Sequence, residues 1–278
     1  MSGTPFSIVD VFAERLYAGN QLAVFTDAGA LSADEMQLLA RETNFSETTF
    51  VVDAKPTVRI FTPKAEIPFA GHPTLGTAAV LMGDARSITL HFKVGPIRVE
   101  RAGDLFWMRQ NAPTFGRRVD AREIAAVLGL APSDIHGVAE EVSTGLPHLV
   151  VPVASLDALR RAKLDGPRYD KLIAGLDAKC IFPFAVGVSD PRNHVSVRQF
   201  APFYDINEDP ATGSGNGCLA AYLSRHKILG SDVVDVRSEQ GAHLGRPSLL
   251  HLKARPGPNA IEVDVGGKVQ RVAEGRLV

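Results

Sequence analysis

The sequence contains little cysteine and no paired metal ligands. Cys180 and Cys218 are the only two cysteines among 278 residues. Two thiols cannot build a disulfide framework or a four-thiolate metal site, and these two are not spaced as a CxxC redox pair. The eight histidines form no HExxH motif and no pair at the spacing of metal ligands. We therefore predict no metal site.

A long hydrophobic run is also missing. The longest stretch without Asp, Glu, Lys or Arg covers residues 67–83, and prolines, a glycine and a histidine interrupt it. A membrane span needs about 20 continuous apolar residues. The first ten residues lack the basic start and long apolar core of a signal peptide. The sequence therefore predicts a cytoplasmic protein without a membrane partner.

Positive and negative side chains are nearly equal in number. Thirty Lys and Arg against thirty-one Asp and Glu leave a net charge of −1, which gives no overall field to attract nucleic acid. We expect no nucleic-acid partner. With 45% apolar and 22% charged residues, the chain has the composition of an ordinary globular protein, and its length fits two domains or one large one.

Two segments without any charge are the most informative part of the chain. They cover residues 73–82, shortly after Gly71, and 214–223, directly after Gly213. A helix that is apolar or small on every face must be enclosed on all sides. Short β-rich runs surround both segments, so we predict an α+β fold in which a curled sheet wraps around a central helix, once in each half. The expected strands are residues 6–12, 22–26, 48–52, 58–61, 88–92, 97–101, 105–110, 138–143, 148–153, 180–188, 195–200, 233–238, 248–254 and 261–265.

The two halves share an order of features. Phe-Thr-Pro at 61–63 precedes the first buried helix, and Phe-Ala-Pro at 200–202 precedes the second. This order argues for duplication of one plan, although the shared positions are few. A polar segment rich in Gly and Pro at 110–120 is the expected linker. Amphipathic outer helices are expected after Ser32, which with Glu35 fits a capping box, and at 156–162 and 169–176.

His72 and Glu47 are the first candidates for chemistry. His72 precedes Pro73, which places it at the N-cap of the first buried helix, where free N–H groups and the helix dipole suit a carboxylate ligand. A histidine that only caps the helix is an equal alternative. Glu47 lies between Phe45 and Phe50, and partial desolvation there would raise its pKa toward the range useful for proton transfer. A solvated turn glutamate is the competing interpretation.

The second buried helix repeats this arrangement. Asp209 precedes a proline, and Gly213 and Ser214 begin the charge-free segment. The glycines here do not follow the GxGxxG spacing and no lysine follows them, so we do not predict a nucleotide site. Small residues here favour close approach of backbone donors to a small ligand.

At this point the residues resemble the phenazine-biosynthesis PhzF-like family. The resemblance extends from VDVF at 9–12 to LGRPS at 244–248, which is nearly the whole chain. Its motifs are NFSETTF at 44–50, RIFTP at 59–63, PFAGHPTLG at 68–76 and EDPATGS at 208–214. The family is similar in fold to diaminopimelate epimerase, which implies two pseudo-symmetric domains of a curled, mostly antiparallel sheet around a buried helix, with the site in the cleft between them. The expected domains are 1–115, completed by a C-terminal strand at 268–278, and 116–267.

The resemblance also implies roles for single residues. Glu47 matches the family's glutamate acid/base, His72 its cleft histidine and Asp209 its aspartate. Gly71, Gly213 and Ser214 match ligand-binding positions at the two helix ends. The related epimerases have a cysteine before each of these helices. The matching positions here are Ala70 and Thr212. Neither side chain can act as a thiolate, so the sequence departs from the pattern of a two-thiol mechanism.

These observations lead to one expected activity with two alternatives. We expect an isomerase without cofactor that shifts a proton within a small carboxylate-bearing substrate, with Glu47 as the base. The alternatives are an amino-acid racemase or epimerase without the cysteine pair, and a non-catalytic protein that binds small acids. The family resemblance further implies a homodimer. The substrate cannot be read from the sequence.

Overall fold

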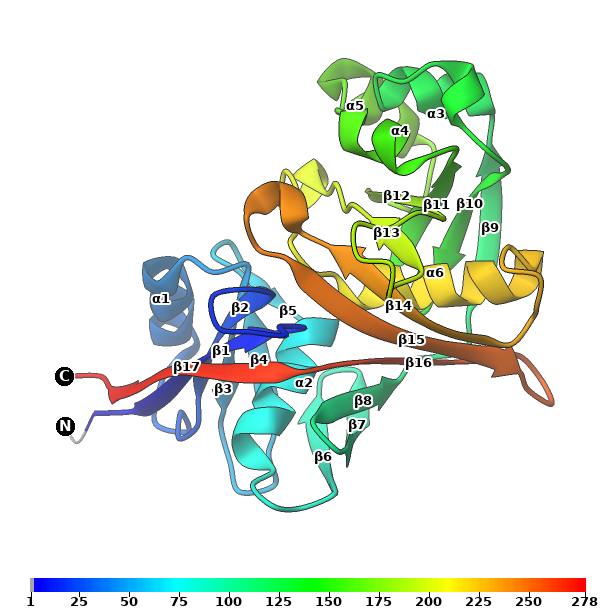
Figure 1. Cartoon of the computed structure of the whole chain (residues 1–278). Helices are drawn as coiled ribbons and strands as arrows, with labels where there is room; N and C mark the ends of the chain where they lie inside the picture. The colour runs from blue at the N-terminus through cyan, green and yellow to red at the C-terminus, as the bar shows by residue number, and fades with distance from the viewer. Residues whose placement is uncertain (1–2) are drawn as a thin grey trace. The chain divides into compact units, whose positions relative to one another are not determined.

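The protein is described by a computed structural model that covers residues 3–278. The chain forms two compact units (Figure 1). Unit 1 contains residues 3–109 together with Gly266–Val278, and unit 2 contains Gln110–Val265. Unit 2 is therefore a continuous segment inserted into a discontinuous unit 1.

Unit 1 contains a six-stranded sheet and three further strands. The six-stranded sheet has the order β17-β1-β2-β3-β4-β5, and only its β2–β3 pair is parallel. The three further strands pair antiparallel in the order β6-β7-β8. The strands are β1 (Pro5–Val11), β2 (Asn20–Phe25), β3 (Glu47–Val51), β4 (Val58–Phe61), β5 (Glu66–Ile67), β6 (Ser87–Phe92), β7 (Gly95–Ala102), β8 (Leu105–Arg109) and β17 (Val269–Arg276).

The outer helix of unit 1, α1 (Ala33–Thr43), begins as predicted. The Ser32 side chain accepts a hydrogen bond from the Glu35 amide, and the Glu35 carboxylate accepts one from the Ser32 amide at 2.8 Å, which completes the capping box. Asn44 ends the helix in the left-handed conformation, with φ 51°. The chain then turns directly into β3, so this helix end positions the first residues of that strand.

The central helix of unit 1, α2 (Gly71–Leu81), is buried on all faces over its first eight residues. This burial confirms the prediction from its lack of charge. A Cβ on Gly76 would lie 2.5 Å from Leu22 Cδ2, so any larger residue there would force the Leu22 side chain to move. The helix has no basic residue in its last turn. Two arginines on strands donate hydrogen bonds to carbonyls at this end instead. Arg271 on β17 donates to the Val80 carbonyl at 3.1 Å, and Arg101 on β7 donates to the Gly83 carbonyl at 3.2 Å.

Unit 2 has a larger mixed sheet of order β16-β15-β14-β13-β12-β11-β10-β9. Its central helix, α6 (Gly213–His226), contacts β10, β11, β14 and β15. The outer helices pack on the sheet through a separate apolar core. The remaining elements are β9 (Thr114–Val119), β10 (Ala139–Ser143), β11 (Pro147–Val153), β12 (Cys180–Ala185), β13 (Val195–Val197), β14 (Val234–Gln240), β15 (Ser248–Pro256), β16 (Ile261–Gly267), α3 (Ala121–Val127), α4 (Leu156–Arg161), α5 (Gly166–Ala174) and the short helices η1 (Pro132–Asp134), η2 (Pro202–Tyr204) and η3 (Ala242–Leu244).

The structure confirms the α+β class and corrects the reading of one segment. Residues 110–120, expected as a linker, contain the strand β9, which pairs with β10, and helix α3 follows it at once. Thr114, Arg117 and Arg118 fit in this strand because most of its side chains are exposed or half-buried. The contacts divide the chain after Arg109, whereas the predicted boundary fell after residue 115.

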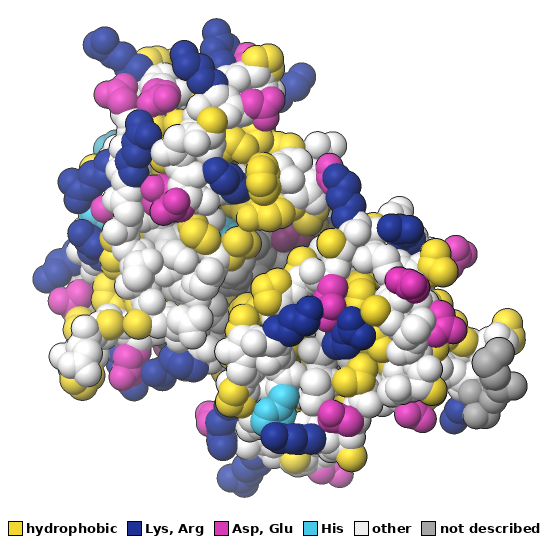
Figure 2. Space-filling model, turned by 180° about the vertical axis from the view of Figure 1, so that it is seen from behind, with side chains coloured by type: hydrophobic (Ala, Val, Ile, Leu, Met, Phe, Trp, Pro, Cys, Tyr) yellow, Lys and Arg dark blue, Asp and Glu magenta, His cyan; other side chains and the backbone are white. Residues whose placement is uncertain are grey.

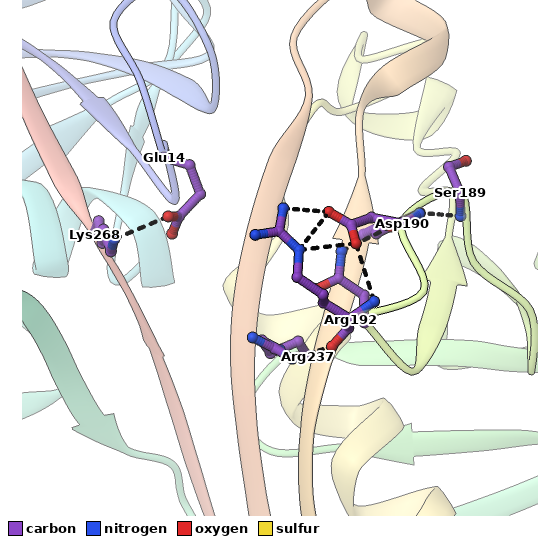
Figure 3. A network of polar contacts seen from close by, with 8 residues as sticks. Glu14, Ser189, Asp190, Arg192, Arg237 and Lys268 are labelled. Carbon is purple, nitrogen blue, oxygen red and sulfur yellow. Dashed lines mark hydrogen bonds and ion pairs between the residues drawn. The ribbon is translucent and has the colours of Figure 1, made fainter.

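Surface charges are mixed. On the face drawn in Figure 2, basic and acidic side chains are interspersed over the molecule. Figure 3 shows two local examples. In unit 1, Lys268 pairs with Glu14 at 2.9 Å. In unit 2, Asp190 accepts hydrogen bonds from Arg192 at 3.0 Å, and the carbonyl of Arg192 accepts one from Arg237. Within residues 3–278, no helix combines the length and the hydropathy that a bilayer span requires.

Candidate active site

Glu47 is held in a desolvated position at the start of β3. Its side chain is 13% exposed, and Oε2 is buried without a hydrogen-bond partner among the described residues. Burial raises the pKa of Glu47 from 4.5 to about 7, and the polar side chain of the neighbouring Ser46 opposes part of this rise. A carboxyl group with this pKa is present in both protonation states near neutral pH, as a general acid/base requires.

His72 lies in the first turn of α2 and faces Glu47. Its side chain is 5% exposed, and Nε2 lies 3.7 Å from Glu47 Oε2. On the other side of the ring, Nδ1 lies 3.5 Å from Asn20 Nδ2. A buried base and a buried imidazole are thus within reach of each other in unit 1.

The prediction that His72 caps α2 was wrong. The N-cap residue is Ala70, in extended conformation, and the helix begins at Gly71. Pro73 is therefore the third helical residue rather than the first. Proline is tolerated there because the N–H groups of the whole first turn have no acceptor within the helix. His72 stands inside the helix start, so its amide belongs to the group of N–H donors that gives this end its positive character.

The candidates of unit 2 are joined by a compact set of hydrogen bonds. Asp209 is 8% exposed, and its carboxylate accepts a hydrogen bond from the Thr212 hydroxyl. Gln240 Nε2 donates to Thr212 Oγ1 at 3.0 Å and to the Asp209 carbonyl at 2.9 Å. Gln240 Oε1 accepts from the Thr212 amide at 3.1 Å and from Asn216 Nδ2 at 3.0 Å. This arrangement fixes Asp209 at the start of α6.

Gly213 and Ser214 are the first two residues of α6, after the N-cap Thr212. At the next residue, a Cβ on Gly215 would lie 2.5 Å from the Phe182 ring, so the helix start packs tightly on β12. Glycine at this position lets the first turn approach the sheet. The helix start is thereby held beside Asp209.

The structure thus brings the candidates together in two groups. Glu47, Gly71 and His72 are neighbours in unit 1, whereas Asp209, Gly213 and Ser214 are neighbours in unit 2. Their meeting in one site stays a prediction. Sequence reasoning missed Asn20, Ser46, Thr212, Asn216 and Gln240 as partners. Thr212 and Asn216 stood beside recognised motif positions, but nothing in the sequence around Gln240 marked it.

Neither thiol has the properties of a catalytic base. Both cysteines are buried, and burial raises the pKa of each thiol to about 12. Cys218 Sγ lies 3.7 Å from His148 Nδ1, but burial lowers the pKa of that imidazole to about 4. The pair is therefore neutral at physiological pH. Within residues 3–278, no three His, Cys, Asp or Glu side chains are grouped as metal ligands.

Comparison with known proteins assigns the family. The sequence model of the PhzC-PhzF family, described as phenazine biosynthesis-like protein, matches residues 9–275. The chain belongs to this family. It is 36% identical to trans-2,3-dihydro-3-hydroxyanthranilate isomerase of Pseudomonas aeruginosa, with 98% of each chain covered. It is 35% identical, again over 98% of each chain, to an uncharacterized isomerase of Mesorhizobium japonicum. The chain is thus an isomerase of the PhzC-PhzF family.

Solved structures agree with this assignment. The crystal structure of a phenazine biosynthesis protein of the PhzF family from Bacillus anthracis matches with a TM-score of 0.92 and 26% identity, over 100% of both chains. A probable proline racemase from Agrobacterium radiobacter matches with a TM-score of 0.63 and 11% identity, over 99% of this chain and 93% of that one. The second likeness concerns the fold alone. It confirms the predicted two-domain, epimerase-like architecture of this PhzC-PhzF member.

Proposed function

We propose that this isomerase moves a proton between two carbons of a small carboxylate-bearing substrate, with Glu47 as the single acid/base. The observation that supports this most strongly is the pKa of about 7 of the buried Glu47 carboxyl group. A single base is sufficient when the proton leaves and returns on the same face of the substrate. General acid–base catalysis of this kind contributes about 10²- to 10⁴-fold to the rate.

The other candidates have binding and orienting roles in this proposal. The first-turn N–H groups of α2 and α6 would hold the substrate carboxylate, because helix N-termini favour anions. His72 would stabilise the Glu47 carboxylate and orient the substrate. Asp209, held by Thr212, would accept a hydrogen bond from a substrate amino or hydroxyl group. This assignment requires that residues of both units face one substrate.

The substrate class follows from the relatives. We propose a small cyclic amino acid or hydroxy acid with an acidified C–H bond, and trans-2,3-dihydro-3-hydroxyanthranilate, the compound in the name of several relatives, is the first compound to test. The fold likeness to proline racemase favours racemisation as the second candidate. Two observations oppose it: both thiols are neutral, and Ala70 and Thr212 replace the epimerase cysteines.

Incorporation of deuterium separates the two activities. The enzyme is incubated in D₂O with this compound and with a panel of cyclic amino acids, and the products are analysed by NMR. A proton shift places deuterium on a carbon that carried no exchangeable proton before, whereas racemisation labels the original stereocentre. Label only at the stereocentre would refute the proton shift. Asp209→Asn should lose turnover as Glu47→Gln does, and a fully active Asp209→Asn would exclude a role for the Asp209 carboxylate in the reaction.

We also propose that the enzyme acts as a homodimer. Only the family resemblance supports this. Sedimentation equilibrium of the purified protein would measure the mass directly, and a monomer at micromolar concentration would refute it.

A further inference from the structure

A chain of polar side chains leads from the start of β2 to Glu47. Ser46 Oγ lies 3.3 Å from Asn20 Oδ1, Asn20 Nδ2 lies 3.5 Å from His72 Nδ1, and His72 Nε2 lies 3.7 Å from Glu47 Oε2. Asn20 and His72 are buried. The parallel pairing of β2 with β3, in which Leu22 faces Glu47, brings Asn20 beside Ser46.

The hydrogen bonds in this chain determine which way the Asn20 amide points. The Ser46 hydroxyl donates to Asn20 Oδ1, so the amide nitrogen faces His72. An amide nitrogen only donates hydrogen bonds. His72 Nδ1 must therefore accept, and the neutral ring then carries its proton on Nε2, the nitrogen that faces Glu47.

The opposite orientation is electrostatically unfavourable. It would place Asn20 Oδ1 against His72 Nδ1, which would then have to carry the proton. His72 Nε2 would in that case present a lone pair to Glu47 Oε2, a buried oxygen. When Glu47 is ionised, two acceptors facing each other without water repel, so the first orientation has the lower energy in the ionised form that acts as the base.

We infer that Asn20 is a positioning residue that keeps His72 in its Nε2–H tautomer, so that the imidazole donates toward Oε2 of Glu47. The inference deepens the proposed function and rests on Glu47 being its base. With an N–H group facing Oε2, the proton that Glu47 removes from the substrate is carried on Oε1. The tautomer therefore selects the oxygen that exchanges protons with carbon. Ser46 contributes indirectly, because its hydroxyl orients the Asn20 amide.

The tautomer can be measured without a substrate. Long-range ¹H–¹⁵N correlation spectra of protein labelled with ¹⁵N-histidine distinguish a protonated from a bare ring nitrogen, and the His72 signals are assigned from their loss in His72→Asn. For the unmodified enzyme above the pH at which His72 titrates, we expect a protonated Nε2 and a bare Nδ1. A protonated Nδ1 under these conditions overturns the inference, whatever the variants show.

Asn20→Asp gives the sharper contrast. An ionised aspartate accepts hydrogen bonds and cannot donate them, so Nδ1 of His72 should become protonated, either as the other neutral tautomer or as the imidazolium. Asn259→Asp is the matched control, because Asn259 is exposed and the change in charge is the same. It should leave the His72 signals unchanged. A folded Asn20→Asp protein with a bare Nδ1 contradicts the inference.

The test of the His72 tautomer and the test of Glu47 as the base can fail independently of each other. If the enzyme shows the Nε2–H tautomer while Glu47→Gln retains full turnover, the proposed base is wrong and the role of Asn20 toward His72 stands. If Glu47→Gln is inactive but Nδ1 is protonated in the unmodified enzyme, the base stands and the role of Asn20 is wrong.

Discussion

Replacing Glu47 with Gln should make the protein more stable while it removes the base. Raising a pKa from 4.5 to about 7 corresponds to roughly 3 kcal/mol, at about 1.4 kcal/mol for each pH unit. The folded state binds this proton more tightly than the unfolded state. The favourable contribution of the neutral form is therefore complete below pH 4.5 and is lost as the pH rises through about 7. Above that pH the folded protein bears the full cost of a buried carboxylate.

Glutamine has nearly the same shape and no charge, so Glu47→Gln avoids this cost. We expect its free energy of unfolding to exceed that of the unmodified protein by about 3 kcal/mol at roughly pH 8, and by less than about 1 kcal/mol at roughly pH 5. Urea unfolding of both proteins at the two pH values measures the difference. Glu42→Gln, an exposed change on α1, is the control and should show no such dependence on pH.

The same variant should lose turnover by at least about a hundredfold, within the usual range for loss of a general base. Loss of activity together with a gain in stability is the expected signature of a desolvated catalytic group. If Glu47→Gln is less stable than the unmodified protein at alkaline pH, or equally stable at both pH values, Glu47 is not desolvated in the folded state. The argument for its raised pKa then fails.

Three further predictions concern the pH dependence of turnover, the packing of α6 and the reactivity of the cysteines. The value of kcat/KM should rise with pH through about 7, because the ionised form of Glu47 is the proposed base, and a profile that is flat between about pH 5 and pH 8 would contradict this. Gly215→Ala should lower the free energy of unfolding by about 1 to 3 kcal/mol, because the new Cβ would lie 2.5 Å from the Phe182 ring; Gly166→Ala, whose Cβ meets no atom within 4 Å, should be nearly neutral. Both buried cysteines should react slowly with a thiol reagent in the native protein and rapidly in urea, and rapid native labelling would show that a thiolate is accessible.

Local signals explain which parts of the fold could be predicted. The capping box of Ser32 and Glu35 lies within four consecutive residues, and the lack of charge along α2 and α6 is visible in the sequence itself. The strand β9 was missed because its polar residues and its Gly and Pro neighbours are typical of a linker. The predicted start of α2 was two residues too late, with His72 at the N-cap, because the rule for proline at a helix start does not distinguish the positions of the first turn.

The candidate site was predictable only in part, because many of its contacts join residues that are far apart in the sequence. The motif around Glu47 pointed to the proposed base, but the desolvation of this carboxyl group depends on residues that belong to other elements. Asn20 is separated from His72 by 52 residues, and Gln240 from Thr212 by 28. No periodicity or spacing reports such contacts, because β2 and β14 are placed beside the helix starts by the tertiary fold.

The discontinuity of unit 1 has a consequence for synthesis on the ribosome. Strand β1 pairs with β2 on one edge and with β17 on the other, so one of the first strands to emerge must wait for the last. During that interval all of unit 2 is translated, and because it is continuous, its internal contacts are complete before β17 appears. The unpaired edge of β1 is meanwhile open to wrong partners. A chain that ends before Val269 and is free of the ribosome would therefore carry all of unit 2 and an unfinished unit 1, because the sheet on which Glu47 lies lacks β17.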